Sequence, residues 1–242
     1  MRLAVISDIH GNLVALEAVL EDLRRRAPDA VVNLGDCVTS PLWPRETYEL
    51  LDTLRVPTVR GNHDRWIAAM PADETSRTIL FTHDALTAEQ RASLGALPFT
   101  LTVADGILAL HGTPESDVEY LLEDRVDGRL ALVSQATLSS RLQSISADLI
   151  LCGHSHHQHS AWAAGGRLVV NPGSVGHPRS VDNADRARVE AGSPHARYAI
   201  ATRRAGQWTV ELIALAYDWR QAAARARSLG RSDWADAFVG AT

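Results

Sequence analysis

The feature that most limits how this chain can fold is a repeated one: short apolar segments that each end in a polar turn containing glycine. The first three pairs of segment and turn are Leu3–Ile6 with Asp8-Ile9-His10-Gly11, Ala30–Leu34 with Gly35-Asp36, and Val56–Arg60 with Gly61-Asn62-His63-Asp64. Apolar residues at helical spacing lie between them, over 13–23 and 46–54. This alternation predicts parallel strands with right-handed crossovers, and it places the polar turns together at one edge of a sheet.

Asp8 and His10 follow the first predicted strand and are two residues apart. Side chains two apart on an extended chain point the same way, so the sequence predicts that both grip one metal ion from one side. Asp8 taken alone could equally cap the helix that follows it. The metal interpretation gains its weight from the similar turns downstream.

The rest of the chain predicts further elements. Helices are expected at 87–97, 117–122, 130–142 and 219–238, and strands at 101–103, 107–110, 149–152, 168–170, 198–202 and 208–214. The pattern is weaker over 65–98, which we interpret as a lid-like elaboration, and the polar segment 182–194 is expected to be a loop. We expect one domain over 1–242, with C-terminal helices in 219–242.

Composition excludes several classes of protein. With 45% hydrophobic and 22% charged residues, the 242-residue chain is typical of globular proteins, and a net charge of −5 argues against a nucleic-acid surface. No apolar run reaches the roughly 18 residues of a membrane span, and no secretory signal pattern is present. Two cysteines exclude a disulfide framework and favour the cytoplasm. The sequence leaves a homo-oligomer open.

Polar residues with metal-binding groups gather at the predicted strand ends. They are Asp8, His10, Asp36, Asn62, His63, His111, His154 and His156. Oxygen and imidazole donors in this mixture suit borderline divalent metals, and they suit neither calcium alone nor a structural thiolate zinc site. Eight donors are too many for one tetrahedral ion and about right for two ions that share a bridge.

Five short blocks in this order and spacing resemble the signature of the calcineurin-like metallophosphoesterase superfamily. They are Asp8-Ile9-His10, Gly35-Asp36, Gly61-Asn62-His63-Asp64, His111-Gly112 and Gly153-His154-Ser155-His156. Ser7–Asn12 and Asn171–Gly176 add a resemblance to the small bacterial branch of YfcE-type phosphodiesterases.

The resemblance implies a four-layer α/β/β/α fold of two mixed sheets flanked by helices. It also implies two divalent metal ions, manganese by expectation, with iron, nickel, cobalt or zinc as alternatives. One ion is then held by Asp8, His10, Asp36 and His156, and the other by Asp36, Asn62, His111 and His154. The resemblance makes His63 a general acid over the leaving-group oxygen and Asp64, or a main-chain carbonyl, the group that orients an imidazole.

The implied reaction is hydrolysis of a small phosphodiester by a hydroxide that bridges the metals. A phosphomonoesterase, including a protein phosphatase for phosphoserine or phosphothreonine, is the alternative enzyme. A binding scaffold without catalysis is a third interpretation, and it predicts damaged ligand positions, whereas every expected donor is present. Besides Asn62 and His63, we assign His83 and Arg179 to substrate binding, with solvated surface as the alternative for both. Trp219, Trp234 and Phe238 are expected to form core packing or a subunit contact.

Overall fold

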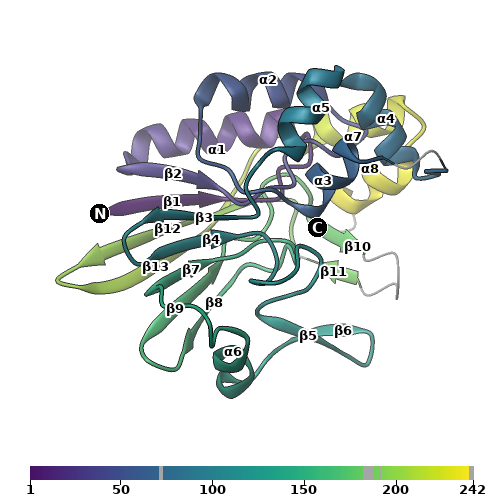
Figure 1. Ribbon diagram of the computed structural model, residues 1–242. Helices are drawn as coiled ribbons and strands as arrows, with labels where there is room; N and C mark the ends of the chain where they lie inside the picture. The colour runs from purple at the N-terminus through teal and green to yellow at the C-terminus, as the bar shows by residue number, and fades with distance from the viewer. Residues whose placement is uncertain (71–72, 182–187, 191, 240–242) are drawn as a thin grey trace.

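Two β-sheets form the centre of the molecule in a computed structural model that describes residues 1–70, 73–181, 188–190 and 192–239 (Figure 1). The first sheet has the order β13 (Gln207–Leu215), β12 (Ala196–Arg204), β1 (Arg2–Ile6) and β2 (Ala30–Asn33). The second has the order β3 (Thr100–Ala104), β4 (Ile107–Leu110), β7 (Leu149–Leu151), β9 (Arg167–Asn171) and β8 (His159–Ala163). Parallel pairing joins β1 to β2 in the first sheet, and β4 to β7 and β7 to β9 in the second.

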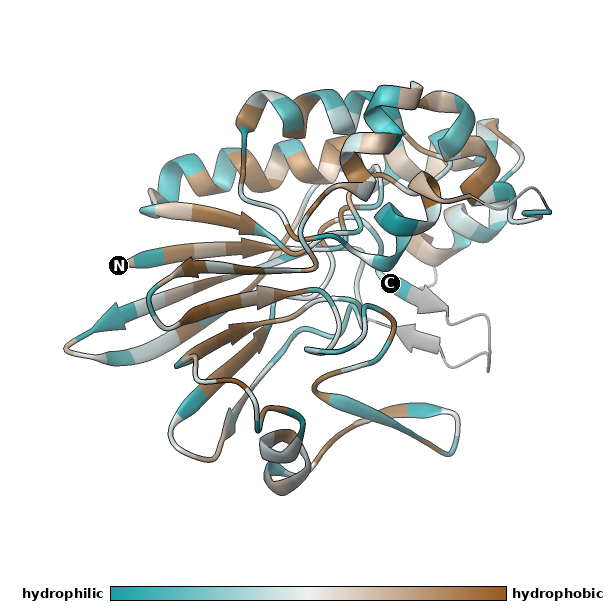
Figure 2. Cartoon of the chain, viewed as in Figure 1, coloured by the Kyte–Doolittle hydropathy of each residue, from teal (hydrophilic) through white to brown (hydrophobic). Residues whose placement is uncertain are grey.

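The two sheets pack face to face, and helices cover their outer faces. In β1, Leu3 and Val5 enter the cluster between the sheets, whereas Ala4 and Ile6 pack with helix α1 (Leu13–Arg26) and α2 (Pro44–Leu54). Both faces of this strand are buried, which explains its uninterrupted apolar sequence. Helix α6 (Gln135–Arg141) covers the second sheet, and strands β3, β4 and β7 are drawn largely in the hydrophobic colour (Figure 2). The predicted four-layer α/β/β/α architecture is confirmed.

Further helices lie near the ends of β1 and β2 to which their arrows point (Figure 1). They are α3 (Asn62–Ala68), α4 (Arg77–Ala85), α5 (Ala88–Gly95), α7 (Trp219–Ser228) and α8 (Ser232–Val239). The predicted helix start at Thr87 is correct, since its side chain accepts the N–H of Gln90. No described helix has both the length and the apolar character that a membrane crossing requires.

Three predicted elements differ from the structure. The expected helix at 117–122 is irregular chain. The expected helix at 130–142 is confirmed only over α6, because its first residues belong to the hairpin of β5 (Glu123–Val126) and β6 (Arg129–Leu132). The reason is the turn Asp127-Gly128, where both residues have positive φ, 51° and 74°. The expected strand at 56–60 makes only one bridge, Asn33 to Thr58, because Pro57 has no N–H to extend a ladder.

Two further differences concern strands that the sequence did not predict. Strand β8 pairs with β9 at the edge of the second sheet. Within the predicted loop at 182–194, residues 188–190 form β11 (Arg188–Glu190), which pairs with β10 (Arg179–Val181), and residues 182–187 and 191 lie outside the described residues.

Candidate metal centre

The polar turns after β1, β2, β4 and β7 meet at one place, as the strand pattern predicts. The donors fall into two clusters, Asp8 with His10 and His156, and Asp36 with His111 and His154. Within each cluster the ligand atoms lie within 4.8 Å of one another. The residues of both clusters are buried, except that His154 is partly exposed.

The first cluster has the electronic character of an ion site. The Nδ1 atoms of His10 and His156 donate to the carbonyl oxygens of Thr39 and His177, both at 3.1 Å. The Nε2 atoms of the two rings then face each other at 3.0 Å. Their lone pairs repel each other unless a cation lies between them. Two nitrogens bound at about 2.1 Å and at a right angle are about 3.0 Å apart.

Asp8 completes this cluster with a carboxylate oxygen that makes no hydrogen bond among the described residues. Its Oδ2 accepts the Ser7 hydroxyl at 2.6 Å and the His154 N–H at 3.2 Å. Its Oδ1 is buried without a hydrogen-bond partner among the described residues, and it lies 3.3 Å from Nε2 of His156. A buried carboxylate oxygen in this condition is costly unless a cation or proton satisfies it, so the residues present fit a metal ion.

The second cluster adds an amide oxygen to imidazole and carboxylate. Nε2 of His111 lies 3.0 Å from Oδ1 of Asn62 and 3.5 Å from Oδ2 of Asp36. The Asp36 Oδ2 atom is also 3.8 Å from Nε2 of His10 in the first cluster. Asp36 therefore lies between the two clusters, where the predicted bridging ligand belongs.

Backbone carbonyls orient all four imidazoles of the site. Besides the two bonds of the first cluster, His111 donates from Nδ1 to the Leu34 carbonyl at 2.6 Å, and His154 donates from Nε2 to the Val118 carbonyl at 3.0 Å. Each bond fixes the ring and directs its other nitrogen toward the donors, an arrangement typical of metal-binding histidines.

The backbone of the ligand turns differs from the expected extension of the strands. Five predicted ligands have left-handed φ angles, namely Asp8 (53°), His10 (46°), Asp36 (54°), His154 (66°) and His156 (59°). Such values are uncommon outside glycine and concentrate at functional sites. Asp8 and His10 do converge, but the predicted reason, that they continue an extended strand, is wrong, because the chain turns sharply at both residues. Asp8 does not cap α1 either, because the Asn12 side chain accepts the Ala15 N–H.

In the metal-free centre, His10 and His154 are neutral and Asp8 is ionised, whereas His111 holds its proton against the Asp36 carboxylate. Burial lowers the pKa of His10 to about 3 and that of His154 to about 4, and repulsion from His156 and His111 respectively adds to the shift. Burial is the largest influence on Asp8 and opposes its ionisation, yet the interactions with His156 and His111 together outweigh it and lower the pKa to about 2. Burial also opposes the charge of His111, but the adjoining Asp36 raises its pKa to about 10.

His63 lies over this centre without belonging to either cluster. It is the second residue of α3, its N–H donates to Asp36 Oδ1 at 2.9 Å, and its ring is 5.2 Å from that of His10. Its Nδ1 atom is buried and has no hydrogen-bond partner among the described residues. Burial lowers the pKa of this imidazole, so a neutral ring faces the site.

Asp64 holds the backbone of the site. Its Oδ2 accepts the N–H groups of Asp36 and Gly61, both at 2.9 Å, and its Oδ1 accepts that of Cys37 at 3.0 Å. These bonds tie the start of α3 to the turn that carries Asp36. A Cβ added at Gly61 would overlap the Asp36 carboxylate, which explains glycine at this position. The orienting role expected of Asp64 therefore acts on Asp36, and backbone carbonyls orient the imidazoles.

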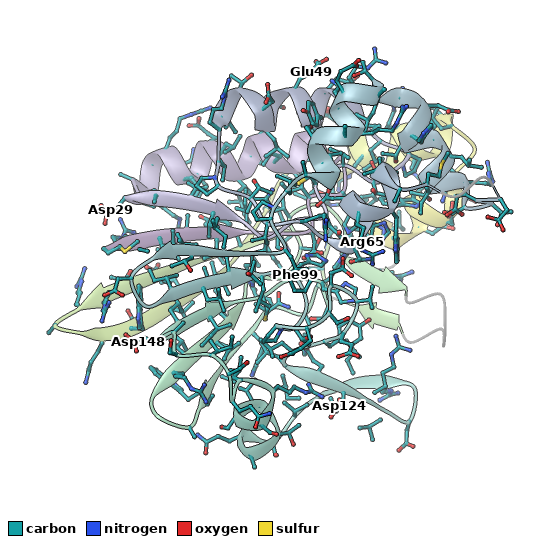
Figure 3. All side chains as sticks on the ribbon, viewed as in Figure 1. Asp29, Glu49, Arg65, Phe99, Asp124 and Asp148 are labelled. Atoms are coloured by element: carbon teal, nitrogen blue, oxygen red, sulfur yellow. The ribbon has the colours of Figure 1, made fainter. Side chains whose placement is uncertain are left out.

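An ion pair that the sequence did not reveal joins α3 to the turn after His111. Arg65, labelled in Figure 3, donates from Nε and Nη2 to the two oxygens of Asp117, both at 2.7 Å. This two-pronged geometry is the strongest that arginine makes with a carboxylate. It fixes the helix that carries Asn62 and His63 relative to His111. No local signal in the sequence pairs residues 52 positions apart.

The two further substrate residues predicted from the sequence lie farther out. His83 is on α4, with Nδ1 3.5 Å from the Asp84 carboxylate, and its carbonyl accepts Arg91. Arg179 begins β10, and its carbonyl oxygen accepts the Nδ1–H of His177. Arg179 is thus connected to the first cluster through its backbone and His177, whereas no bond that the structure describes links His83 to the centre. Substrate binding by both side chains stays a prediction.

Comparison with known proteins agrees with this geometry. A sequence model of the calcineurin-like phosphoesterase superfamily domain matches residues 1–193. An uncharacterised protein of Methanocaldococcus jannaschii is 29% identical over 244 residues, which cover 91% of this chain and 89% of that protein. A metallophosphoesterase from Sphaerobacter thermophilus is 28% identical with a TM-score of 0.72, over 97% of this chain and 100% of that one. A hypothetical protein from Pyrococcus horikoshii OT3 shares the fold, with a TM-score of 0.76 at 22% identity over 97% and 96% of the two chains.

Proposed function

Because the chain belongs to the calcineurin-like phosphoesterase superfamily, we propose that it is a metal-dependent phosphodiesterase that acts on a small phosphoester. The observation that carries this proposal is the pair of adjacent donor clusters, in which Asp36 of the second lies 3.8 Å from His10 of the first, with an unpartnered Asp8 oxygen and two facing Nε2 atoms. The small number of cysteines favours the cytoplasm as the place of action.

Two divalent cations fit these residues. The first would be held by Asp8, His10, Asp36 and His156, and the second by Asp36, Asn62, His111 and His154. When bound, such a pair supplies Lewis-acid charge that attracts a phosphoester and makes water a better nucleophile. We infer manganese, because imidazole, carboxylate and amide oxygen together suit it. Iron, nickel, cobalt and zinc are the alternatives, because they suit the same set of ligands.

The charge of the protein groups favours an anionic substrate. The carboxylates of Asp8 and Asp36 are the only charges that the eight predicted donors contribute when their imidazoles are neutral. Two dications would therefore leave the centre positive, which stabilises the charge that builds on the phosphoryl oxygens.

His63 is the residue that we assign to stabilising the leaving group. Its Nδ1 lacks a partner among the described residues, and its ring borders His10. A neutral imidazole here can donate a hydrogen bond to the leaving oxygen and stabilise its charge. The bond from its own N–H to Asp36 keeps the ring in register with the metal ligands.

A diester needs room for a second organic group, and a hollow of about 470 Å³ adjoins His154. Its lining includes Val118, whose carbonyl accepts His154, and Tyr120, whose ring stacks on His154 at 4.9 Å between centroids. This space supports the preference for diesters that the resemblance to the YfcE-type branch implies.

The test compares bis(p-nitrophenyl) phosphate with p-nitrophenyl phosphate, using protein loaded with Mn²⁺. We expect the diester to have the higher kcat/KM. A faster monoester would overturn the diester preference in favour of a phosphomonoesterase. No turnover of either, with no metal retained, would favour a binding scaffold.

A further inference from the structure

The C-terminal helices α7 and α8 lie beyond the residues that match the family domain, yet they are fixed to the site. Their buried residues enclose Leu42, which is fully buried in the loop after Asp36. Arg225 donates from Nε to the Leu42 carbonyl at 3.2 Å, and Arg231 donates from Nη2 to the Thr78 hydroxyl at 2.8 Å. The pair thus packs beside α4, on the side of the molecule where β1 and β2 end (Figure 1).

Trp234 is the residue of this pair that reaches the metal centre. Its ring centroid is 4.3 Å from that of His177 and 6.4 Å from that of His10. His177 in turn accepts the Nδ1–H of His156 through its carbonyl oxygen. The indole therefore borders the side of the first cluster on which His10 lies.

The exposure of α8 divides its residues by role. Ala235 and Phe238 are fully buried and supply the packing against Leu42. Trp234 is a partly exposed residue, as are His63, Trp66 and His177 around the same centre. The His63 ring lies 5.2 Å from His10 and 4.7 Å from Trp66. His10 is therefore flanked by partly exposed aromatic rings from α3 and from α8.

We infer that Trp234 forms a wall of the substrate site and contacts the organic group of the phosphoester. An indole offers a flat apolar surface, so it favours a flat, apolar organic group next to the phosphate over a small alkyl group. This specificity role rests on the proposed function only in that the ligand is a phosphoester. It assigns a substrate contact to a helix outside the family domain, in addition to the core packing that the sequence predicted, since Trp234 also packs against the cluster around Leu42.

The test measures binding of two phosphonates that differ only in the organic group. Phenylphosphonate and methylphosphonate are titrated by calorimetry into Mn²⁺-loaded wild type, Trp234→Ala, Trp234→Phe and Trp219→Ala. Trp219 is the matched control, because it packs in the same helical pair and, within the part of the chain that the structure describes, no ring contact places it against the histidines of the centre. We expect Trp234→Ala to weaken phenylphosphonate about threefold to tenfold and methylphosphonate less than about twofold. Trp234→Phe should keep most of the preference, and Trp219→Ala all of it.

Several results would overturn the inference. They are equal weakening of both phosphonates by Trp234→Ala, the same change in Trp219→Ala, or a wild type without preference for the phenyl group. If the preference disappears in Tyr120→Ala and survives in Trp234→Ala, the organic group lies in the hollow beside His154. Should alanine unfold the protein, Trp234→Leu keeps apolar bulk without the aromatic face, and the same loss is expected.

Turnover separates this inference from the proposed function. Phenyl p-nitrophenyl phosphate and methyl p-nitrophenyl phosphate release the same chromophore and are assayed in parallel. If the wild type hydrolyses neither ester, yet Trp234→Ala weakens its binding of phenylphosphonate, the proposed activity is refuted and the substrate contact of Trp234 is supported. If the wild type hydrolyses both esters and Trp234→Ala leaves both kcat/KM values unchanged, the substrate contact of Trp234 is refuted and the proposed activity is supported.

Discussion

The substitution Asp64→Asn tests whether a buried carboxylate that is not a metal ligand holds the centre together. Asp64 is fully buried and accepts three backbone N–H groups, at 2.9, 2.9 and 3.0 Å. Asparagine of the same shape can keep the two bonds to one oxygen, from Asp36 and Gly61. Its NH₂ group then faces the N–H of Cys37, so one buried donor is left without an acceptor.

The cost follows from these three bonds. Burial and the charge of Asp36 raise the pKa of Asp64 to about 7, so the carboxylate is ionised at about pH 9. At that pH, losing a hydrogen bond to a charged group costs about 2 kcal/mol, and turning the other two from charged to neutral costs about 0.5 kcal/mol each. We expect Asp64→Asn to lower the free energy of unfolding of the metal-free protein by about 3 kcal/mol. Because the Asp36 backbone loses part of its support, the affinity for Mn²⁺ should also fall about 10-fold to 100-fold.

Urea unfolding and calorimetric titration with Mn²⁺ measure the two effects. Asp29→Asn is the control: the Asp29 carboxylate, labelled in Figure 3, also accepts a backbone N–H, from Arg2 at 2.7 Å, but its side chain is 63% exposed. The control should change stability by less than about 0.5 kcal/mol. The reasoning would be refuted if Asp64→Asn and Asp29→Asn had the same free energy of unfolding and the same affinity for Mn²⁺.

Three further predictions concern the same site. His63→Ala should retain both metals and lose about 10²-fold to 10⁴-fold in diester turnover, whereas Asp36→Ala should lose the metals, and equal metal loss by elemental analysis would contradict the separate roles. Asp36 raises the pKa of His111 to about 10 against the burial that opposes it. The stability that this pair adds to the metal-free protein is thus complete below the unfolded value of about pH 6.5 and is lost as pH rises toward 10. Urea unfolding between pH 7 and 10 should show that loss in wild type and not in His111→Gln, and a flat wild-type profile would contradict it. Gly61→Ala should reduce metal content, because its Cβ meets the Asp36 carboxylate, and full occupancy would show that the close approach is unimportant.

The sequence predicted the sheets and the convergence of the polar turns well because both depend on local patterns. Uninterrupted apolar strands such as Leu3–Ile6 end in turns rich in glycine, aspartate and histidine, and parallel strand ends must meet at one edge. The blocks at Asp8, Asp36 and His154 therefore converge as expected. What the pattern could not give is the backbone within each turn, since left-handed φ angles at these residues are imposed by tertiary contacts.

The misses have the same physical origin. The helix predicted at 130–142 began inside β6 of the hairpin, although Asp127-Gly128 is a recognisable hairpin turn. The ion pair of Arg65 with Asp117 and the approach of Trp234 to His10 join residues far apart in the chain. Only packing brings them together, and no spacing in the sequence records it.

Anomalous diffraction from crystals grown with Mn²⁺ tests the central claim most directly. Two peaks about 3.5–4 Å apart are expected, one against Asp8, His10 and His156 and the other against Asn62, His111 and His154, with Asp36 between them. A peak at a different place in the molecule, or no peak among these side chains, would contradict the assignment of this site as a shared two-metal centre.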